Sequence, residues 1–220
     1  MKRLSYKNII SIFLITVSVN AQYLHVIGKE VFDNKGDKII LKGMGLGGWL
    51  VPEGYMLGTW GSPTSIRNRI TDLIGEDSTE VFYEKFEKNY VAEEDINQLA
   101  EWGFNSVRLP FHYKTLSPTY GSFNEKGFSV IDSVIAWCGR NEIYLILDMH
   151  VAPGSQSGDE NADGDEGAKL WDSPENQEWA VDIWGEIARR YATERWIGGY
   201  DLLNEPVLFN GGSQVRNLQR

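Results

Sequence analysis

The chain has 220 residues, with 42% hydrophobic and 24% charged side chains, and these proportions exclude a disordered segment, a collagen-like repeat and a membrane bundle. Its formal net charge of -10 argues against nucleic acid or an anionic membrane surface as the main partner. The single cysteine, Cys138, excludes an internal disulfide. An ordinary globular protein with a sizeable core remains.

The first 21 residues have the pattern of a signal peptide. Basic side chains near the start precede an apolar run over 9–19, and Ala21 is a small residue at the position that a signal peptidase reads. The run is too short to span a bilayer, which takes about 20 apolar residues. We therefore predict a signal peptide over 1–21 and a mature chain over 22–220 that is secreted to an extracellular or periplasmic location. An uncleaved anchor or a buried helix is the alternative.

The mature chain is predicted to open with a hairpin. Its strands, over 24–32 and 38–41, flank a turn over 33–37 that is rich in Asp, Asn and Gly. Further on, a helix is expected after Asp77, with Glu80 placed for a capping box. The inward side chains of this helix are expected to be Val81, Phe82 and Phe86.

The rest of the chain is predicted to alternate strands with amphipathic helices. Strands are expected over 104–109, 143–149 and 200–204. Helices are expected over 93–102, around Cys138 and from Ser173-Pro174 onward. The last two helices would bury the apolar sets Phe128, Ile131, Val134, Ile135, Cys138 and Ala180, Ile183, Trp184, Ile187, Ala188, Tyr191.

Short apolar strands separated by amphipathic helices indicate a parallel sheet, either open and doubly wound or closed into a barrel. Arg108, His150 and the pair Asn204-Glu205 each lie at the C-terminal end of a successive strand. A barrel brings all these ends to one mouth, whereas an open sheet gathers only those at a switch point. No Gly-x-Gly-x-x-Gly or Walker motif supports the open form. The sequence therefore favours the barrel.

Four short motifs follow one another at these strand ends. They are Leu46-Gly47-Gly48-Trp49-Leu50, Val107-Arg108-Leu109-Pro110, Leu147-Asp148-Met149-His150 with Ala152-Pro153-Gly154-Ser155-Gln156, and Leu203-Asn204-Glu205-Pro206. Together they resemble glycoside hydrolase family five, the cellulase-type retaining β-glycosidases. The resemblance implies an α/β fold, the (β/α)8 TIM barrel, of which this chain covers the N-terminal hairpin and roughly the first four βα units.

The resemblance also implies roles for individual residues. Glu205 corresponds to the general acid/base, which protonates the glycosidic oxygen and later deprotonates water. Asn204 would hold the sugar 2-hydroxyl, a bond that strengthens in the transition state. Arg108 would lie below the reacting sugar and orient the second carboxylate, and His150 would bind a sugar hydroxyl. For single residues the alternatives are a barrel-internal ion pair at Arg108 and a core histidine at His150.

Further side chains are candidates for substrate contacts. Glu53 and His112 could bind sugar hydroxyls, with simple surface roles as the alternative. Trp49, Trp60 and Trp171 lie in loops beyond strand ends, where an indole face could stack on a sugar ring. These three are weaker predictions than the strand-end residues.

A retaining mechanism needs a second carboxylate, the nucleophile, about 5–5.5 Å from the first. In the family that glutamate ends the seventh strand, whereas the fourth predicted strand lies at 200–204. We therefore expect the nucleophile beyond residue 220. Residues 22–220 are then the N-terminal part of the catalytic domain, inactive alone.

The acidic segment 159–165 resembles the start of a calcium loop, because it alternates oxygen-bearing side chains and contains Gly164. The bidentate acid expected at position twelve falls on Leu170, however, so a solvated acidic loop is the preferred interpretation and no metal is predicted.

These observations predict a secreted retaining glycoside hydrolase that cleaves β-linked glucans in polysaccharide degradation. It would be endo-β-1,4-glucanase-like or exo-β-1,3-glucanase-like. Its partner is the glucan substrate, with no cofactor, no nucleic acid, no membrane in the mature form and no obligate protein partner. The alternative is a non-catalytic glycan-binding or degenerate half-barrel, which would keep the aromatic loops without needing Glu205.

Material exported by a secreting host should start at Gln22, because signal peptidase removes residues 1–21. Intact-mass spectrometry of the secreted protein measures this directly. An exported protein that still carries Met1 would contradict the signal-peptide prediction.

Overall fold

The computed structural model describes residues 23–33 and 35–208. The predicted signal peptide, 1–21, lies outside the described residues. The chain divides into two compact units, Met1–Ile39 and Ile40–Arg220. Within the described ranges, no helix combines the length and the apolar character that crossing a membrane requires.

The first unit contains a small antiparallel sheet with the strand order β1 (His25–Ile27), β2 (Glu30–Phe32) and β3 (Lys38–Ile39). The single strand predicted over 24–32 is wrong, because the chain turns between β1 and β2. Gly28 has a φ of 65° at this turn, in the left-handed region that favours glycine. The turn before β3 is confirmed, since the Asp33 carboxylate accepts the backbone N–H groups of Lys35 and Asp37.

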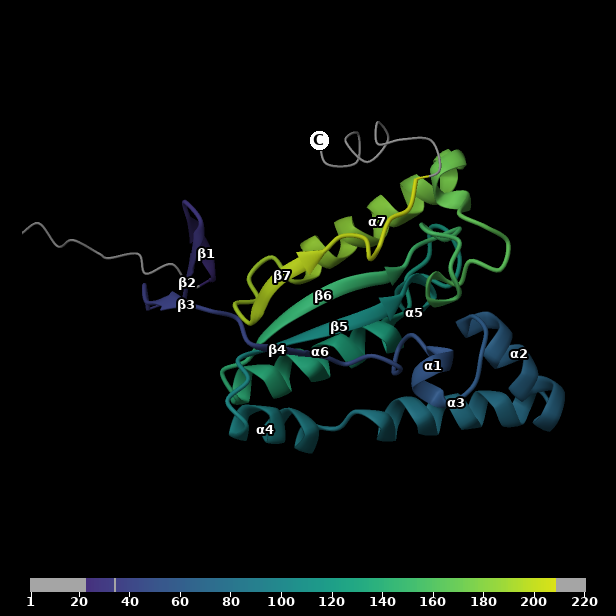
Figure 1. Cartoon of the computed structure of the whole chain (residues 1–220), viewed down its shortest axis with the longest axis horizontal. Coiled ribbons are helices and arrows are strands. Elements are labelled where there is room, and N and C mark those ends of the chain that lie inside the picture. Colours follow the sequence, from purple (N-terminus) through teal and green to yellow (C-terminus); the bar gives the residue numbers. More distant parts are fainter. Residues whose placement is uncertain (1–22, 34, 209–220) are drawn as a thin grey trace, which may run out of the picture. The chain divides into compact units, whose positions relative to one another are not determined.

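The second unit is built on a four-stranded parallel sheet (Figure 1). Its strands are β4 (Gly43–Gly45), β5 (Ser106–His112), β6 (Tyr144–Val151) and β7 (Ile197–Asp201). Their spatial order β4-β5-β6-β7 is the same as their chain order. In a doubly wound sheet the strand order reverses at a switch point, whereas in a barrel each strand lies beside the next. The sheet therefore has the order of a βα-barrel.

Helices connect all three neighbouring pairs of strands. Between β4 and β5 lie α1 (Gly54–Leu57), α2 (Pro63–Ile74), α3 (Glu76–Tyr90) and α4 (Glu93–Glu101). Between β5 and β6 lie α5 (Tyr113–Leu116) and α6 (Glu125–Arg140). The connection from β6 to β7 contains the short 3-10 helices η1 (Glu160–Ala162) and η2 (Lys169–Asp172) and then α7 (Pro174–Arg190).

Two helices differ from the sequence prediction. Helix α2 was not predicted, although its Ser62-Pro63 start repeats the Ser173-Pro174 start of α7 and both serine side chains cap their helices. Helix α3 begins one residue before Asp77, with Gly75 at its N-cap and without the predicted capping box. Its expected inward face is partly wrong, because Val81 is 50% and Phe82 41% exposed.

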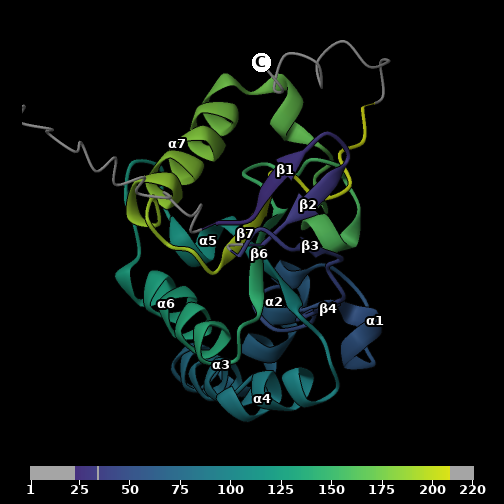
Figure 2. The same cartoon turned by 90° about the vertical axis from the view of Figure 1, so that its left-hand side faces the viewer.

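The core lies between the helices and one face of the sheet. Figure 2 shows the helices and strands of this arrangement along the sheet. Side chains alternate along a strand, so every second residue of β5 and β6 faces this core. The strand residues concerned are Val107, Leu109, Phe111, Leu145, Leu147 and Met149, all fully buried. The predicted face of α6 is confirmed, since Phe128, Ile131, Val134, Ile135 and Cys138 are all buried. Burial of each such large apolar side chain contributes about 1.5–3 kcal/mol.

The alternating residues on the other face of the sheet are largely polar. The strand register pairs Pro110 with Asp148, and Asp148 with Asp201. Two residues earlier in the strands, it pairs Arg108 with Ile146. Arg108, Asp148, His150 and Asp201 therefore lie on the face opposite the core. Parallel pairing thus collects the charged side chains of three strands in one place.

Two helical glycines make a matched test of this packing. A Cβ atom at Gly127, in the first turn of α6, would lie 1.9 Å from the backbone oxygen of Thr115, whereas a Cβ at Gly185 in α7 meets nothing within 4 Å. Gly127→Ala should therefore destabilise the protein by about 1–3 kcal/mol through overpacking. Gly185→Ala should stabilise it by about 0.5–1 kcal/mol through helix propensity. Urea unfolding measures both, and equal effects would contradict the packing described.

Candidate active site

Arg108 ties together the ends of three neighbouring strands. Its Nη2 donates to Asp201 Oδ2 and to Asn204 Oδ1, both at 2.8 Å, and lies 3.0 Å from Asp148 Oδ2. Its Nε donates to Asp201 Oδ2 as well, at 3.2 Å. Ion pairs of this kind hold both partners when further hydrogen bonds satisfy them. The guanidinium therefore fixes the positions of the side chains around it.

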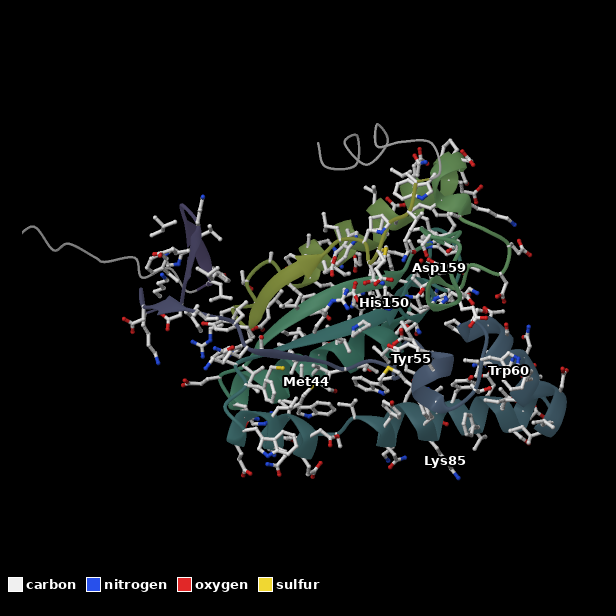
Figure 3. The ribbon with its side chains drawn as sticks, in the orientation of Figure 1. Met44, Tyr55, Trp60, Lys85, His150 and Asp159 are labelled. Atoms are coloured by element: carbon white, nitrogen blue, oxygen red, sulfur yellow. The ribbon has the colours of Figure 1, made fainter. Side chains whose placement is uncertain are left out.

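His150 lies beside this cluster at the C-terminal end of β6 (Figure 3). Its Nδ1 is 2.7 Å from Asp148 Oδ2, and its Nε2 is 3.6 Å from Glu53 Oε1. Burial alone would lower the pKa of His150, but the two carboxylates outweigh it and raise the pKa to about 9. At neutral pH the imidazole is therefore a cation between two acids.

Asp148 is the most deeply buried charged group of the site. It is fully buried, and its Oδ1 has no hydrogen-bond partner within the described ranges. Burial raises the pKa of Asp148, and the hydrogen bond from His150 and the charges of His150 and Arg108 oppose this shift. One oxygen, Oδ2, thus faces both cations.

Asn204 and Glu205 lie in a turn beyond β7, because that strand covers 197–201 and not the predicted 200–204. Gln156 Nε2 donates to the backbone oxygens of His150 at 2.8 Å and of Asn204 at 2.9 Å, which joins this turn to the end of β6. Asn204 is buried, whereas Glu205 is exposed and has a φ of 42°. Asn161 Nδ2 donates to Glu205 Oε2 at 3.1 Å.

The structure does not bring Trp49 and His112 to this cluster. The Trp49 side chain is 3% exposed, and its indole Nε1 donates to the backbone oxygen of Glu87. The predicted stacking of Trp49 on a sugar does not fit this placement, because a buried ring offers no open face. His112 is also buried, and both its ring nitrogens have partners, Lys114 N–H and Asp163 Oδ2. Its predicted contact with a sugar hydroxyl does not fit either.

The predicted solvated loop over 159–165 is wrong for Asp163, whose side chain is only 10% exposed, whereas Asp159 and Asp165 are exposed. Asp163 accepts hydrogen bonds from the N–H and the hydroxyl of Thr64, and Asp165 accepts one from the hydroxyl of Ser62. These carboxylates therefore dock on the start of α2. Among the described side chains, no group of three or more His, Cys, Asp or Glu is arranged to hold a metal ion.

Three residues of the site were not predicted from the sequence. Asp201 binds Arg108, Asn161 binds Glu205, and Tyr55 lies near Glu53. The negative charge of Glu53 raises the pKa of the Tyr55 hydroxyl, and the charge of Glu205 adds to this. The signal for Asp201 was present, since it is a polar residue at the end of an otherwise apolar strand. Tyr55 lies in the short helix α1 and Asn161 in the short helix η1, and neither follows an apolar strand that would give such a signal.

A pocket of about 350 Å³ opens between α1 and η1. Glu53, Tyr55, Trp60 and Asn161 are among its lining residues. Trp60 is 71% exposed, so one predicted tryptophan does present an open ring beside acidic and amide groups. Figure 3 places Tyr55 near the strand end that carries His150. The pocket combines aromatic and hydrogen-bonding side chains, a combination that suits a ligand with a polar ring.

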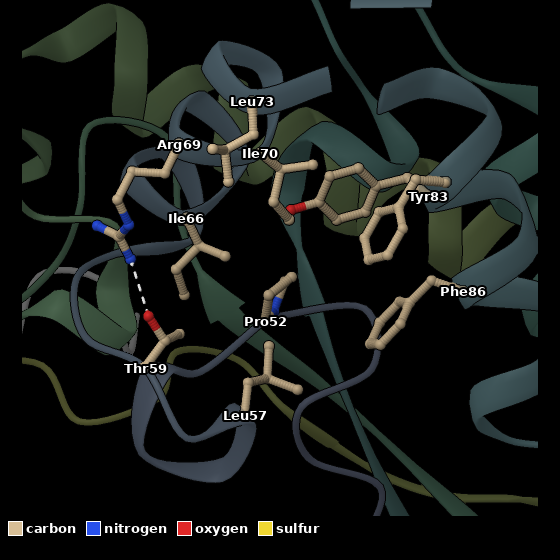
Figure 4. A pocket seen from close by; sticks show the side chains of 10 residues that line it. Pro52, Leu57, Thr59, Ile66, Arg69, Ile70, Leu73, Tyr83 and Phe86 are labelled. Atoms are coloured by element: carbon tan, nitrogen blue, oxygen red, sulfur yellow. Dashed lines mark hydrogen bonds between the residues drawn. The ribbon is translucent and has the colours of Figure 1, made fainter. Parts of the chain in front are cut away.

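Figure 4 shows a different pocket, of about 420 Å³, between the α1 region and helices α2 and α3. Apolar side chains such as Ile66, Ile70 and Phe86 form its walls. The hydrogen bond drawn there runs from Arg69 Nη2 to Thr59 Oγ1 at 3.3 Å. Its lining residues, all within the described ranges, include no carboxylate. It therefore lacks the groups that acid/base chemistry needs.

Comparison with protein families decides the class of this chain. Residues 69–219 match the family described as Cellulase (glycosyl hydrolase family 5). The chain belongs to glycosyl hydrolase family 5. The family resemblance predicted from the four motifs is thereby confirmed.

Curated relatives of this family 5 chain carry different activities in their names. It is 36% identical over 188 residues to a beta-xylosidase of Phanerodontia chrysosporium, covering 84% of the chain and 40% of the relative. It is 38% identical over 130 residues to endoglucanase C of Acetivibrio thermocellus, covering 58% and 36%. It is 26% identical over 223 residues to a probable glucan 1,3-beta-glucosidase A of Aspergillus clavatus, covering 96% and 52%. The chain thus spans about two fifths to one half of these relatives.

Solved structures bear out the fold of this family 5 chain. A rutinosidase from Aspergillus niger matches with a TM-score of 0.60 and 16% identity, covering 78% of this chain and 50% of that one. An endogalactoceramidase matches with a TM-score of 0.58 and 20% identity, covering 84% and 44%. The parallel sheet and its helices are therefore part of a (β/α)8 barrel, as the sequence predicted.

The charge state of His150 can be measured on the 220-residue chain, which contains three histidines. Its imidazole should titrate near pH 9, because Asp148 and Glu53 stabilise the cation. Asp148→Asn should lower this midpoint by about one unit or more, since one carboxylate is lost. Titration by NMR of the histidine Cε1 protons tests this, with His25 of the first unit as the internal reference. An unchanged midpoint in Asp148→Asn would refute the assigned ion pair.

Because the pKa of His150 is raised in the folded state, its ion pair contributes stability below the unfolded value near 6.5. That contribution is lost as the pH rises toward 9.

Proposed function

We propose that this chain is the part of a secreted retaining glycoside hydrolase that supplies the general acid/base, Glu205, for cleavage of β-linked glucans. The observation that carries the proposal is the turn after β7. It buries Asn204 against Arg108 and leaves the neighbouring Glu205 carboxylate exposed at the mouth of the barrel sheet. An exposed acid beside a fixed amide suits proton transfer to a bound glycoside.

Arg108 determines which end of the Asn204 side chain meets the substrate. Its Nη2 occupies the amide oxygen, Asn204 Oδ1, at 2.8 Å. The amide nitrogen, Asn204 Nδ2, lies 3.4 Å from His150 Nε2 and is the end that can donate to a sugar hydroxyl. A donor aimed at the 2-hydroxyl stabilises the transition state of glycoside cleavage. Arg108 thus fixes the orientation of the Asn204 amide, with its oxygen bound to the guanidinium and its nitrogen as the donor.

Glu53 and His150 supply the opposite polarity on the same side of the sheet. The His150 cation can donate, and the Glu53 carboxylate can accept, so together they suit the vicinal hydroxyls of a sugar ring. Tyr55 and the exposed Trp60 line the adjoining pocket and suit the apolar face of a ring.

A neutral glucan is the substrate that these features favour. The chain carries a formal net charge of -10, which disfavours acidic polysaccharides. The names endoglucanase C and glucan 1,3-beta-glucosidase A among the relatives support a β-glucan, while the name beta-xylosidase extends the candidates to another neutral β-glycoside. The basic and apolar start of the sequence supports secretion.

The second carboxylate is proposed to come from sequence that follows the segment described here, as the family resemblance implies. On that basis the 220-residue chain alone should bind glycans and turn over none. Binding without turnover by a complete barrel would instead favour the alternative function, a non-catalytic glycan-binding protein.

The role of Glu205 can be tested in a chimera that continues residue 208 with the C-terminal half of the barrel of the Phanerodontia relative. Glu205→Gln should lower hydrolysis of an unactivated β-glucan about 10²–10⁴-fold, because the leaving oxygen goes unprotonated. An activated aryl β-glucoside needs little protonation, so its rapid burst of released phenol should persist. Steady-state and stopped-flow assays measure these two rates.

Glu175→Gln, an exposed glutamate in the first turn of α7, is the matched control and should keep both rates. If Glu205→Gln hydrolyses the polysaccharide as fast as the control, then Glu205 is not the acid.

A further inference from the structure

The segment between β6 and η2 crosses from the Glu205 turn to the start of α2. We call residues 157–167 the docking loop. Three of its five acidic side chains, Glu160, Asp163 and Asp165, contact the N-terminal region of α2. Asn161, between the first two of them, contacts Glu205. One short loop thus joins a helix start to the proposed acid/base.

The contacts to α2 use groups that a helix leaves unsatisfied. The first N–H groups of a helix have no partner within it and carry partial positive charge. Asp163 Oδ1 accepts the Thr64 N–H at 2.8 Å, and Asp163 Oδ2 accepts the Thr64 hydroxyl at 2.6 Å. Just before the helix, Glu160 Oε2 accepts the Gly61 N–H at 3.1 Å. The loop is therefore held on both sides of Asn161 by charge-assisted hydrogen bonds.

Asp165 adds a third contact to the same helix start. Its Oδ2 accepts hydrogen bonds from the hydroxyls of Ser62 at 2.6 Å and Ser65 at 3.0 Å. Gly164, between the two aspartates, allows the loop to close on itself, since a Cβ atom there would lie 2.3 Å from the backbone of Gly158. The loop is compact as well as docked.

His112 holds Asp163 from the sheet side. Its Nδ1 accepts the N–H of Lys114 at 3.1 Å, so Nε2 carries the proton and donates to Asp163 Oδ2 at 3.2 Å. Burial lowers the pKa of His112, which suits this neutral form. Burial alone would raise the pKa of Asp163, but the bonds from His112 and Thr64 outweigh it and hold the pKa well below its usual range.

The backbone is strained at both ends of this connection. Asp163 has a φ of 52° and Glu205 a φ of 42°, in the left-handed region that non-glycine residues rarely adopt. Such conformations persist where the surroundings over-determine them. Here the surroundings are the bonds to Thr64 and His112 at one end and the Asn161 amide at the other. No other side chain of the described ranges hydrogen-bonds to the Glu205 carboxylate.

We propose that Asn161 is a positioning residue that orients the Glu205 carboxylate, and that docking of Asp163 on Thr64 and His112 holds Asn161 in place. The proposal rests on the proposed role of Glu205 as acid/base. An amide suits this task because it donates to the carboxylate and does not titrate. It occupies Oε2 and leaves Oε1 for the glycosidic oxygen. Tyr55, from α1, lies close enough to Glu205 for the negative charge of Glu205 to help raise the pKa of the Tyr55 hydroxyl, after the larger effect of Glu53.

The contact can be read on the 220-residue chain by NMR of the Asn161 side-chain NH₂ group, identified by its absence in Asn161→Asp. Its resonance should move with pH as the adjoining carboxylate ionises, and this movement should vanish in Glu205→Gln. Asp159→Asn, which removes a neighbouring charge from the same loop, is the matched control and should retain it. A pH dependence that survives Glu205→Gln would overturn the proposal.

Docking is tested by hydrogen exchange of the backbone amides. Asp163→Ala should speed exchange over 157–167 by about tenfold or more, because local opening becomes easier. Asp163→Asn should have a smaller effect, since its amide oxygen can still accept from Thr64. Exchange in α6 reports whether the fold itself survives. Exchange over 157–167 that stays at the wild-type rate in Asp163→Ala, with α6 protected, would show that docking does not hold Asn161.

In the active chimera, Asn161→Asp should lower kcat more than it changes KM. It should also move the alkaline limb of the rate profile up by about one pH unit, because a second carboxylate favours the protonated acid. A loss of activity with an unmoved limb would indicate a structural role only and would overturn the proposal. A failure of the proposed function can be told apart from a failure of this proposal. If Glu205 is not the acid, the Glu205→Gln chimera stays active, whether or not the Asn161 resonance moves with pH.

Discussion

The arrangement of this site depends on one group of charges, Arg108 with the buried Asp148 and the partly exposed Asp201. Each carboxylate comes from a different strand, so the guanidinium acts as a common partner for β5, β6 and β7. Because Asp148 is fully buried, removing Arg108 would leave its carboxylate without one of its two cationic partners. The side chains that meet substrate in our proposal, Asn204 and His150, are held by the same group. Arg108 therefore both joins neighbouring strands of the sheet and holds a side chain that we propose to bind substrate.

Strand periodicity explains why much of the site could be predicted. Arg108, His150 and Asn204 were placed together because parallel strands bring their C-terminal ends to one edge, and the structure does place them there. The apolar face of α6 followed from helical spacing in the same way. In each case the information lies within one element and its neighbour in sequence.

The features that could not be predicted depend on contacts between distant loops. Trp49 is buried because α3 closes over it and Glu87 accepts its indole N–H, 38 residues away. The His112 ring is buried and hydrogen-bonded to Asp163, 51 residues away. No local pattern distinguishes a tryptophan or histidine with such a partner from one that faces a substrate. The same holds for the acidic loop, whose composition indicates solvent but whose partner is the start of α2.

Gln156 has a consequence for how such sites diversify. It binds the main chain only, accepting the N–H of Ala152 and donating to the backbone oxygens of His150 and Asn204. The frame that it holds is therefore indifferent to which side chains project from those positions. Substitutions at these positions leave the three hydrogen bonds of Gln156 in place, because none of them uses a side chain of those positions. Because Gln156 binds only backbone atoms, the connection that it makes between these loops can stay the same while the side chains at the connected positions change.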